Sequence, residues 1–288
     1  MTFPDLGQPC LVTFHAHPDD EAIFTGGTIA MAVAAGWRVV LVVATSGEEG
    51  AKPDWLTGDL AATRRSETLT SARLLGIDRV EFLEYRDSGA DQASTGPSTG
   101  RPSPSGRPVA LDAAPIHEVV STLRRILFEE SACALTSYDR IGIYGHRDHV
   151  RVHQIAAAAV LATGCDLVEA TVGRGALHRL RLDLLERGLE ATSFSGALVD
   201  GIGTDSDPRL VAVDVSRHLW LKRAAIAAHA SQVVEASSFM GVPPGVFHRL
   251  LEVEWFLPTR TVDGRFAALL DAARVKDPRD AQLGVRRP

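Results

Sequence analysis

The sequence predicts an α/β protein built on a doubly wound, mostly parallel β-sheet. Apolar runs alternate along the chain with segments of helical period, and each run is apolar throughout instead of at every second position. Strands buried on both faces show this continuous pattern, and strand-helix alternation is typical of a parallel sheet covered by helices on both sides. At 288 residues the chain can bury a full core, and we expect a single domain spanning 1–288.

The expected elements follow one another in a regular order. Five strands are predicted at residues 10–16, 37–45, 79–85, 132–139 and 166–172. Helices are predicted at residues 20–36, 59–75, 116–130 and 148–164, and Gly76 is placed to cap the second of them. Beyond residue 190 the alternation weakens, and the pattern predicts a strand near 209–215, a helix near 216–235 and an extended segment at 248–258. We expect this irregular C-terminal portion to pack on the sheet and wall the site.

Residues 88–115 differ in composition from the rest of the chain. Gly, Ser, Thr and Pro dominate this stretch, and no apolar period survives in it. Such a composition is typical of a flexible segment. Because strand-helix alternation resumes afterwards, we interpret it as an insertion within the domain and not as a linker between domains. Residues 276–288 are expected to form a polar tail.

The composition is that of a soluble globular protein. A net charge of −6 provides no basic field for phosphates, so we expect no binding to nucleic acid. No apolar run approaches the roughly 18 residues of a membrane span, and the N-terminus lacks the pattern of a signal peptide. Cys10, Cys133 and Cys165 have no Cys-x-x-Cys spacing, which indicates buried thiols in a reducing, cytoplasmic compartment. The sequence does not indicate an oligomeric state.

Two clusters of His and Asp follow two of the predicted strands. The first reads HAHPDDE at residues 15–21, and the second reads YGHRDHVRVH at residues 144–153. In open parallel sheets, ligands bind where the carboxyl ends of strands meet the starts of helices. Three consecutive acids beside two histidines would repel one another there without a positive partner. A divalent metal ion would stabilise such crowding and hold the imidazoles neutral.

Three of these side chains suit a catalytic metal site. His17 and Asp20 from the first cluster and His149 from the second would provide three ligands and leave one position open for water. Three protein ligands with an open position are the arrangement of catalytic zinc sites. Two histidines and one carboxylate also suit non-haem iron, so Zn²⁺ is expected and Fe²⁺ stays possible at this point.

The two clusters belong to a set of short motifs that span most of the chain. In order, these are HPDDE (17–21), GEEG (47–50), RRSE (64–67), YRDSG (85–89), YGHRDH (144–149) and HASQV (229–233). With them the sequence resembles the LmbE/PIG-L family of zinc-dependent N-deacetylases, and within it the mycothiol-pathway deacetylases and conjugate amidases. The resemblance implies a Rossmann-like fold and hydrolysis of acetamides on amino sugars.

The resemblance also implies roles for individual residues. His17, Asp20 and His149 would be the zinc ligands. Asp19 would be the general base that takes a proton from the attacking water and passes it to the leaving amine. An amide needs this help, because its carbonyl is a poor electrophile and its amine leaves poorly unless it is protonated.

Five further residues match family positions. His146 would stabilise the oxyanion as a charged donor, with Asp148 beside it tuning its protonation, and Tyr144 would be a second donor. Arg64 and Asp87 resemble positions that hold the sugar. The family commonly has Pro in the second motif where this chain has Arg147, a departure that leaves every proposed ligand in place.

Other polar residues near these motifs have plainer interpretations. Glu21 is expected to serve the start of its helix or to support a ligand. His153 lies one helical turn after His149 and is expected to pack beside it, since a fourth protein ligand would close the position for water. His15 could lie near the site, and His229 is expected to be a hydrogen-bonded histidine at a helix interface.

We therefore expect a metal-dependent hydrolase that removes an acyl group, most simply acetyl, from an N-acylated amino sugar or its glycoside. The partner would be that small molecule. An amidase acting on a mycothiol-type thiol conjugate is the nearest alternative. A non-haem iron oxygenase and a non-catalytic carbohydrate-binding module are alternatives from other classes, but Asp19 beside the ligands opposes the first, and the Asp19/His146 pair opposes the second.

Overall fold

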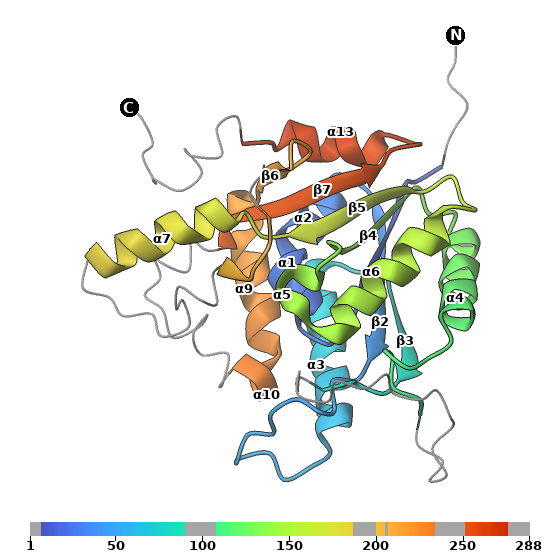
Figure 1. Ribbon diagram of the computed structural model, residues 1–288, viewed down its shortest axis with the longest axis vertical. Coiled ribbons are helices and arrows are strands. Elements are labelled where there is room, and N and C mark those ends of the chain that lie inside the picture. The colour runs from blue at the N-terminus through green and yellow to red at the C-terminus, as the bar shows by residue number, and fades with distance from the viewer. Residues whose placement is uncertain (1–6, 90–107, 187–199, 205–206, 234–250, 276–288) are drawn as a thin grey trace.

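The computed structural model describes residues 7–89, 108–186, 200–204, 207–233 and 251–275 (Figure 1). The strands are β1 (Cys10–His15), β2 (Arg38–Thr45), β3 (Arg79–Tyr85), β4 (Ala134–Tyr138), β5 (Asp166–Thr171), β6 (Val211–Asp214) and β7 (Val253–Arg260). They form one seven-stranded sheet in the order β3-β2-β1-β4-β5-β7-β6. The strands from β3 to β5 are parallel to their neighbours, and β7 is antiparallel to both β5 and β6. The predicted fold class, a doubly wound and mostly parallel sheet, is confirmed.

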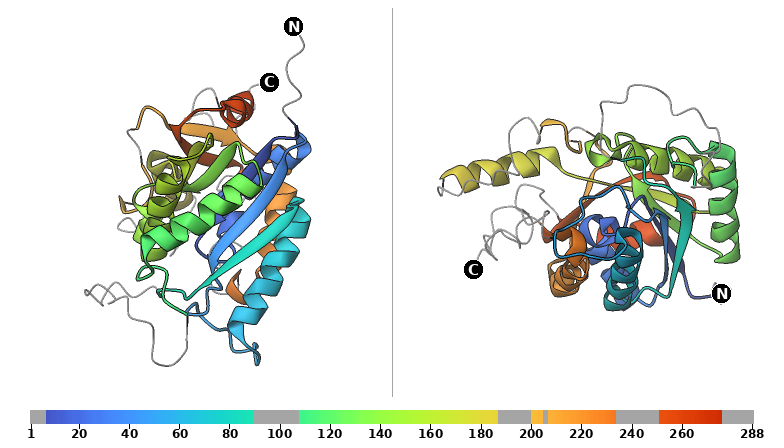
Figure 2. Two further views of the ribbon diagram at one scale, coloured as in Figure 1. Left: turned by 90° about the vertical axis from the view of Figure 1, so that its right-hand side faces the viewer. Right: turned by 90° about the horizontal axis from the view of Figure 1, so that it is seen from below.

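Helices cover both faces of this sheet. They are α1 (Asp20–Phe24), α2 (Gly26–Ala34), α3 (Leu60–Leu75), α4 (Ile116–Glu129), α5 (Gly142–Gly145), α6 (Arg147–Val160), α7 (Arg174–Glu186), α9 (Leu219–Ala228), α10 (Ala230–Val233), α13 (Arg265–Ala272) and a 3₁₀ turn, η2 (Ser216–His218). Figure 2 shows α4 and α6 on one face of the sheet and α3 and α9 on the other. Helix α7 extends away from the sheet (Figure 1).

The protein has two apolar cores, one on each face of the sheet, and the alternation of side chains along each strand explains them. In β1, Val12 and Phe14 belong to the apolar cluster that includes the inner sides of α4 and α6, whereas Leu11 belongs to the cluster under α2 and α9. Successive side chains of a strand point to opposite faces, so a strand covered on both sides must be apolar at every position. The continuous apolar runs in the sequence therefore correspond to these strands.

The strand order creates a switch point beside β1. From β1 the chain proceeds through β2 to β3 on one side, and then crosses to β4 and β5 on the other side. At such a point the segments that leave the carboxyl ends of the two central strands diverge and open a crevice, where ligands bind in open α/β sheets. The HAHPDDE cluster leaves β1 and the YGHRDH cluster leaves β4, so the fold brings both clusters to this crevice.

One predicted helix is interrupted. The sequence pattern predicts a continuous helix over 20–36, but the backbone leaves the helical conformation at Thr25, with φ of −134°, and α1 and α2 are separate. The carboxylate of Glu254, on β7, accepts the backbone N–H groups of Gly27 and Thr28, both at 2.8 Å. These first-turn N–H groups have no partner within their own helix, and a distant carboxylate stabilises the new helix start. Sequence periodicity does not contain that tertiary contact.

The C-terminal portion is more regular than the sequence indicates. The predicted strand near 209–215 is β6, the predicted helix near 216–235 corresponds to η2, α9 and α10, and the extended segment ends in β7. Strands β6 and β7 extend the sheet in the antiparallel direction, and α9 packs against α2 and α3. Helices α7 and α13 were not predicted. Most of the insertion, at 90–107, and the polar tail at 276–288 lie outside the described residues.

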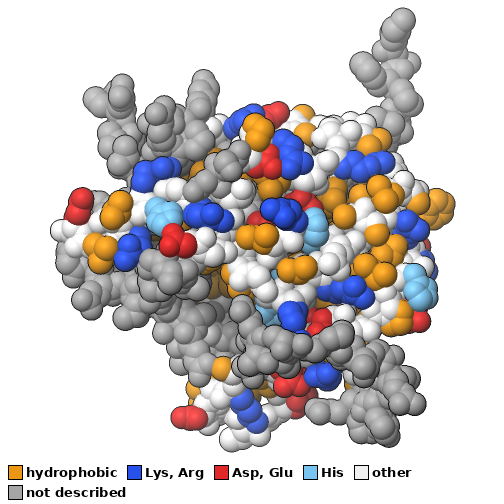
Figure 3. Space-filling view, in the orientation of Figure 1, with side chains coloured by type: hydrophobic (Ala, Val, Ile, Leu, Met, Phe, Trp, Pro, Cys, Tyr) orange, Lys and Arg blue, Asp and Glu red, His pale blue; other side chains and the backbone are white. Residues whose placement is uncertain are grey.

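Within the described ranges, no helix is both long and apolar enough to cross a membrane. Figure 3 shows basic and acidic side chains interspersed over the face drawn.

Candidate active site

The turn after β1 holds one residue in a strained conformation. Asp19 has φ of 91° and ψ of −29°, in the left-handed region that residues other than glycine rarely adopt. Helix α1 begins at the next residue, and the carboxylate of Asp20 accepts the backbone N–H of His17 at 2.9 Å. A left-handed non-glycine residue costs on the order of 1–3 kcal/mol and persists only where its surroundings enforce it. The surroundings of Asp19 therefore enforce this conformation.

The turn after β4 is also tightly constrained. Gly142, Ile143 and Gly145 all have positive φ, and Asp139 fixes the turn by accepting the backbone N–H of Ile143 at 2.8 Å. A Cβ atom on Gly142 would lie 2.7 Å from the Cβ of His149, so only glycine allows α5 to lie this close to α6. The turn therefore fixes His149 and the intervening Tyr144 relative to each other.

The three expected ligands converge in the crevice. His17 Nδ1 lies 3.4 Å from Asp20 Oδ2, His149 Nε2 lies 3.3 Å from the same oxygen, and the two ring nitrogens lie 3.3 Å apart. All three side chains are buried. Side chains separated by 132 residues in the sequence therefore present three candidate ligand atoms to one point.

These distances fit a tetrahedral metal ion. Two ligand atoms placed at tetrahedral angles, each about 2.0–2.1 Å from a zinc ion, lie about 3.3–3.4 Å apart. The triangle formed by His17, Asp20 and His149 has these dimensions. His146 also offers a ring nitrogen within 4.8 Å of those of His17 and His149, so it lies at the edge of the same site. The donor set fits a divalent metal.

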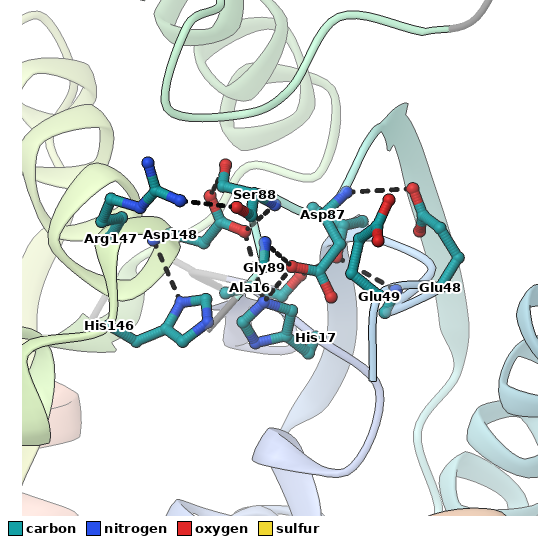
Figure 4. A network of polar contacts seen from close by, with 12 residues as sticks. Ala16, His17, Glu48, Glu49, Asp87, Ser88, Gly89, His146, Arg147 and Asp148 are labelled. Atoms are coloured by element: carbon teal, nitrogen blue, oxygen red, sulfur yellow. Dashed lines mark hydrogen bonds and ion pairs between the residues drawn. The ribbon is translucent and has the colours of Figure 1, made fainter. Parts of the chain in front are cut away.

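The second nitrogen of His17 is held by two carboxylates. His17 Nε2 lies 3.3 Å from Asp148 Oδ2 and 3.6 Å from Asp87 Oδ1, and all three residues are buried (Figure 4). The backbone N–H of Ser88 donates to Asp148, and that of Gly89 donates to Asp87. A metal-binding histidine commonly donates its other N–H to a carboxylate, which fixes the ring and its tautomer. His17 is therefore arranged to bind a metal through Nδ1.

The same carboxylates determine the protonation of His17 when no cation is present. Burial lowers the pKa of the imidazole, but hydrogen bonds to Asp148, Asp20 and Asp87 outweigh it and hold the pKa well above its usual range. Burial raises the pKa of Asp20, but the two histidines outweigh burial and hold that pKa well below its usual range. Asp20 is thus held in the charged form that a metal ligand requires.

Sequence reasoning missed Tyr138, the last residue of β4. Its hydroxyl donates to Asp20 Oδ2 at 2.7 Å and accepts from the backbone N–H of Ala16 at 2.8 Å. Its ring stacks on His149, with centroids 4.1 Å apart and planes 9° from parallel. Tyr138 orients two of the three expected ligands at once. The sequence signal was present, because Tyr138 ends the strand from which the second cluster departs.

Asp19 lies beside the ligands and is only partly exposed. Arg64 Nη2 approaches Asp19 Oδ2 at 3.3 Å. Burial raises the pKa of the Asp19 carboxyl to about 6, the Arg64 guanidinium opposes this rise, and Asp20 adds to it. A carboxylate with a pKa near the working pH can both accept and return a proton. These properties suit the expected role of general base.

His146 occupies the start of α6. Its Nδ1 accepts the backbone N–H of Asp148 at 3.2 Å, so the ring caps the helix and its other nitrogen carries the proton. Burial lowers the pKa of His146 to about 4, and the neighbouring His17 and His149 lower it as well. Both effects favour the neutral imidazole, whose Nε2–H can donate a hydrogen bond. The expected charge on this donor stays a prediction.

Tyr144 lies over the same site. Its hydroxyl is 3.5 Å from His149 Nε2, and its side chain is partly exposed. Burial raises the pKa of the phenol, and the carboxylates of Asp20, Asp19 and Asp87 raise it further. The hydroxyl keeps its proton at neutral pH and can donate a hydrogen bond to a bound group.

Comparison with known proteins identifies the family. The model of the PIG-L family, described as GlcNAc-PI de-N-acetylase, matches residues 12–160, which contain both His/Asp clusters. A 1D-myo-inositol 2-acetamido-2-deoxy-alpha-D-glucopyranoside deacetylase of Mycobacteroides abscessus is 33% identical over 273 residues, covering 88% of this chain and 93% of the relative. The chain belongs to the PIG-L family.

Solved structures share the fold of this PIG-L protein. The N,N'-diacetylchitobiose deacetylase of Pyrococcus horikoshii superimposes with a TM-score of 0.50 and 22% identity, covering 88% of this chain and 86% of that one. A 4-carboxy-2-hydroxymuconate hydratase of Pseudomonas putida KT2440 superimposes with a TM-score of 0.55 and 14% identity, covering 87% and 95% of the two chains. The fold hosts different reactions, so the site residues must decide the chemistry.

Two residues of the PIG-L motifs that are expected to hold the sugar, Arg64 and Asp87, lie beside the site and contact protein groups. Arg64 is buried and donates to the backbone carbonyls of Gly47 and Pro18, both at 2.7 Å, in addition to Asp19. Asp87 is buried against His17. Both side chains are engaged with protein groups, and their contact with a sugar stays a prediction. The loops after β1 and β2 meet at Arg64, and the Nη1 and Nη2 groups of one guanidinium hold a backbone carbonyl of each loop.

The expected influence of Asp148 on His146 is electrostatic. Its carboxylate contacts His17 and both the backbone N–H and the hydroxyl of Ser88, and only its backbone N–H reaches His146. Its charge still acts on His146 electrostatically. The first turn of α6 explains the arrangement, because a residue two positions after the cap points its side chain away from the capping ring.

Arg147, the departure from the family pattern, ties the ends of the insertion to α6. It donates to the Asp112 carboxylate at 3.1 Å. It also donates to the backbone carbonyl of Ser88 at 2.7 Å (Figure 4). Residues on both sides of the 90–107 segment are thus fixed beside the site by one guanidinium.

Three further histidines near the motifs, His15, His153 and His229, have other partners in the described part of the chain. His15 is buried among the hydroxyls of Thr13, Thr25 and Tyr138. His153 contacts Glu169 at 2.7 Å, which places it against the sheet and away from the ligands. His229, at the end of α9, is fully buried and forms an ion pair with Glu21 at 2.7 Å.

Proposed function

We propose that this protein is a zinc-dependent N-deacetylase that hydrolyses the acetamide of an N-acetylated amino sugar or of its glycoside. Family membership supports the reaction type, because the PIG-L model is described as a de-N-acetylase and the mycobacterial relative is named as a deacetylase of a 2-acetamido-2-deoxy-glucoside. The fit of the donor set to zinc supports the metal.

The observation that carries the proposal is the triangle of candidate ligand atoms next to the carboxylate of Asp19, a residue with a strained backbone. His17, Asp20 and His149 present atoms 3.3–3.4 Å apart, and Asp19 follows the first of them by two residues. A non-haem iron oxygenase needs no carboxylate base beside its ligands, and a carbohydrate-binding module needs neither the ligands nor the base. Hydrolysis of an amide uses both.

The residues of this chain would perform the proton transfers. Zinc held by His17, Asp20 and His149 would polarise the amide carbonyl and make the attacking water more acidic. Asp19 would take one proton from that water as the new C–O bond forms. It would return the proton to the amide nitrogen as the C–N bond breaks, so that acetate and a free amine leave.

Two neutral donors would stabilise the oxyanion that develops on the amide oxygen. The helix-capping bond leaves the proton of His146 on Nε2, and Tyr144 retains its phenolic proton. A preorganised donor in a water-poor site contributes about 3–4 kcal/mol to the transition state. Neither donor needs to change its charge during the reaction.

The experiment combines metal analysis with amine release. Purified protein, loaded separately with Zn²⁺ and Fe²⁺, would be assayed for primary amine and acetate on N-acetylglucosamine, its α-glycosides including the inositol glycoside, and a mycothiol-type cysteinyl amide. We expect one metal per chain and equal amounts of acetate and amine from an acetamido sugar. Cleavage of only the cysteinyl amide would assign the chain to conjugate amidases, and no amine from any substrate would refute the proposal.

A further inference from the structure

The carboxylate of Glu21 is buried next to the site and takes no part in the proton transfers proposed above. Glu21 is fully buried and accepts three hydrogen bonds. Its Oε1 accepts from Ser71 Oγ at 2.6 Å and from His229 Nε2 at 2.7 Å, and its Oε2 accepts from the backbone N–H of Asp19 at 3.1 Å. The two oxygens are thus divided between two scaffold side chains and the strained turn.

The two scaffold residues come from different parts of the fold. Ser71 lies on α3, and His229 follows α9, so the side chains reach Glu21 from helices that pack against each other. Ser71 and His229 are also fully buried. An ionised carboxylate without water requires such partners, and these two fix its position relative to α3 and α9.

The third hydrogen bond of Glu21 comes from Asp19, the residue with the strained backbone. Asp19 has the left-handed φ of 91° described above, and its own side chain forms no capping bond to α1. The Glu21 carboxylate holds the backbone N–H of this residue, while Arg64 holds the preceding carbonyl and the Asp19 side chain. The carbonyl of Pro18, the backbone N–H of Asp19 and the Asp19 carboxylate are thus all hydrogen-bonded to buried side chains.

We propose that Glu21, anchored by Ser71 and His229, is a positioning residue that keeps Asp19 in its left-handed conformation and so aims the general base at the substrate. The inference rests on the proposed function, since it assigns a purpose to the placement of Asp19. It also assigns a role to the HASQV motif: His229 acts on the reaction through Glu21 and Asp19 without touching the substrate.

The test is a pair of matched variants, each compared with the zinc-loaded wild type. Glu21→Met has similar length and removes both acceptors. Glu254→Met removes a second buried carboxylate that also accepts backbone N–H groups and pairs with a cation, Lys222, but lies under α2. We expect Glu21→Met to lower kcat about 10- to 100-fold, as misplacement of a reacting group does, with KM and zinc content unchanged. Glu254→Met should lower thermal stability without lowering kcat.

A second readout does not depend on turnover. In a crystal structure of Glu21→Met, Asp19 should leave the left-handed region or turn its carboxylate away from Arg64. An unchanged Asp19 would overturn the inference, and so would a wild-type kcat in Glu21→Met. If the wild type releases no amine from any substrate, the proposed function fails, and the conformation of Asp19 still decides whether Glu21 holds it.

The His229 position provides an independent test if Glu21→Met fails to fold. His229→Gln keeps an N–H group that can reach Glu21, whereas His229→Leu has none. We expect kcat to fall by about 10-fold in His229→Leu and to recover most of that loss in His229→Gln, with zinc content constant in both. Equal kcat values in the two variants would contradict the inference.

Discussion

His17 and Asp148 form the contact that orients the candidate metal site: the Nε2 atom of the histidine lies 3.3 Å from Oδ2 of the aspartate. The other ring nitrogen thereby faces Asp20 and His149. An imidazole that could rotate or change its tautomer would bind a metal ion less tightly. The hydrogen bond to Asp148 fixes both the ring orientation and the tautomer of His17 in the metal-free protein.

The first prediction concerns this contact. Asp148→Asn should weaken metal binding by about 10- to 100-fold, since the amide is a poorer acceptor and no longer favours a proton on His17 Nε2. Competition with a fluorescent chelator would measure the dissociation constant. Asp112→Asn is a matched control, because Asp112 contacts Arg147 and has no contact with His17 among the hydrogen bonds described. Equal affinities in Asp148→Asn and in the control would contradict the orienting role.

The second prediction separates the base from the ligands. Asp19→Asn should lower kcat by about 10²- to 10⁴-fold, the usual contribution of a general base, while zinc content stays stoichiometric. His149→Ala should lose the metal as well as the activity. Elemental analysis and initial rates would measure both quantities. Asp59→Asn is a suitable control, because Asp59 caps α3 through its side chain and asparagine caps equally well. Substantial turnover in Asp19→Asn would refute the base assignment.

The third prediction distinguishes two roles for Arg64. A lysine at this position cannot reach Gly47, Pro18 and Asp19 together, because its single ammonium lacks the planar fork of the guanidinium. If Arg64 holds the loops, Arg64→Lys should lower kcat by about 10-fold or more and leave KM nearly constant. If it holds the sugar, KM should rise instead. Steady-state kinetics decides between these outcomes, and Arg65→Lys, next to it on the exposed side of α3, is the control.

The sequence predicted the parts of the fold that depend on local pattern. The strands and the helices α3, α4 and α6 follow from apolar periodicity, and Asp59 and Gly76 mark the ends of α3 as expected. The location of the site also followed, because the two clusters come directly after strands whose carboxyl ends must meet. Local sequence contains this information, since each cluster sits on the element that positions it.

The remaining features depend on contacts between distant residues. Nothing in the sequence around residue 25 shows that Glu254 will start a new helix there, 227 residues away from Gly27 in the chain. The partners of Asp148 and Arg64 are likewise set by how three loops meet. A family motif can indicate that a residue matters, but only the folded structure shows whether it faces the ligand or the scaffold.

The fourth prediction concerns the dependence of stability on pH. Burial lowers the pKa of His153, but the ion pair with Glu169 outweighs it and raises that pKa in the folded protein. The stabilisation by this pair is therefore fully present below the unfolded-state pKa of about 6.5 and is lost as the pH rises through the folded-state pKa. The free energy of unfolding should fall more between pH 6 and pH 9 in the wild type than in His153→Gln. Urea unfolding at each pH would measure these free energies. An equal fall in the wild type and in His153→Gln would contradict this prediction.

The fifth prediction concerns the buried pair of Lys222 and Glu254. Their charged groups lie 2.7 Å apart, and each side chain is 1% exposed. Lys222→Met would leave the carboxylate buried without its cation, and within the described ranges the N–H groups of Gly27 and Thr28 would be its remaining hydrogen-bond donors.

Removing one partner of a buried pair costs about 3–5 kcal/mol, so Lys222→Met should be strongly destabilised in chemical unfolding. Replacing both partners at once, in Lys222→Met with Glu254→Gln, should recover a large part of the loss, because no unpaired charge stays buried. Since the pair lies under α2 and does not contact the ligands, kcat should change little in either variant. A double variant no more stable than the single one would show that the charge pair is not the source of the loss.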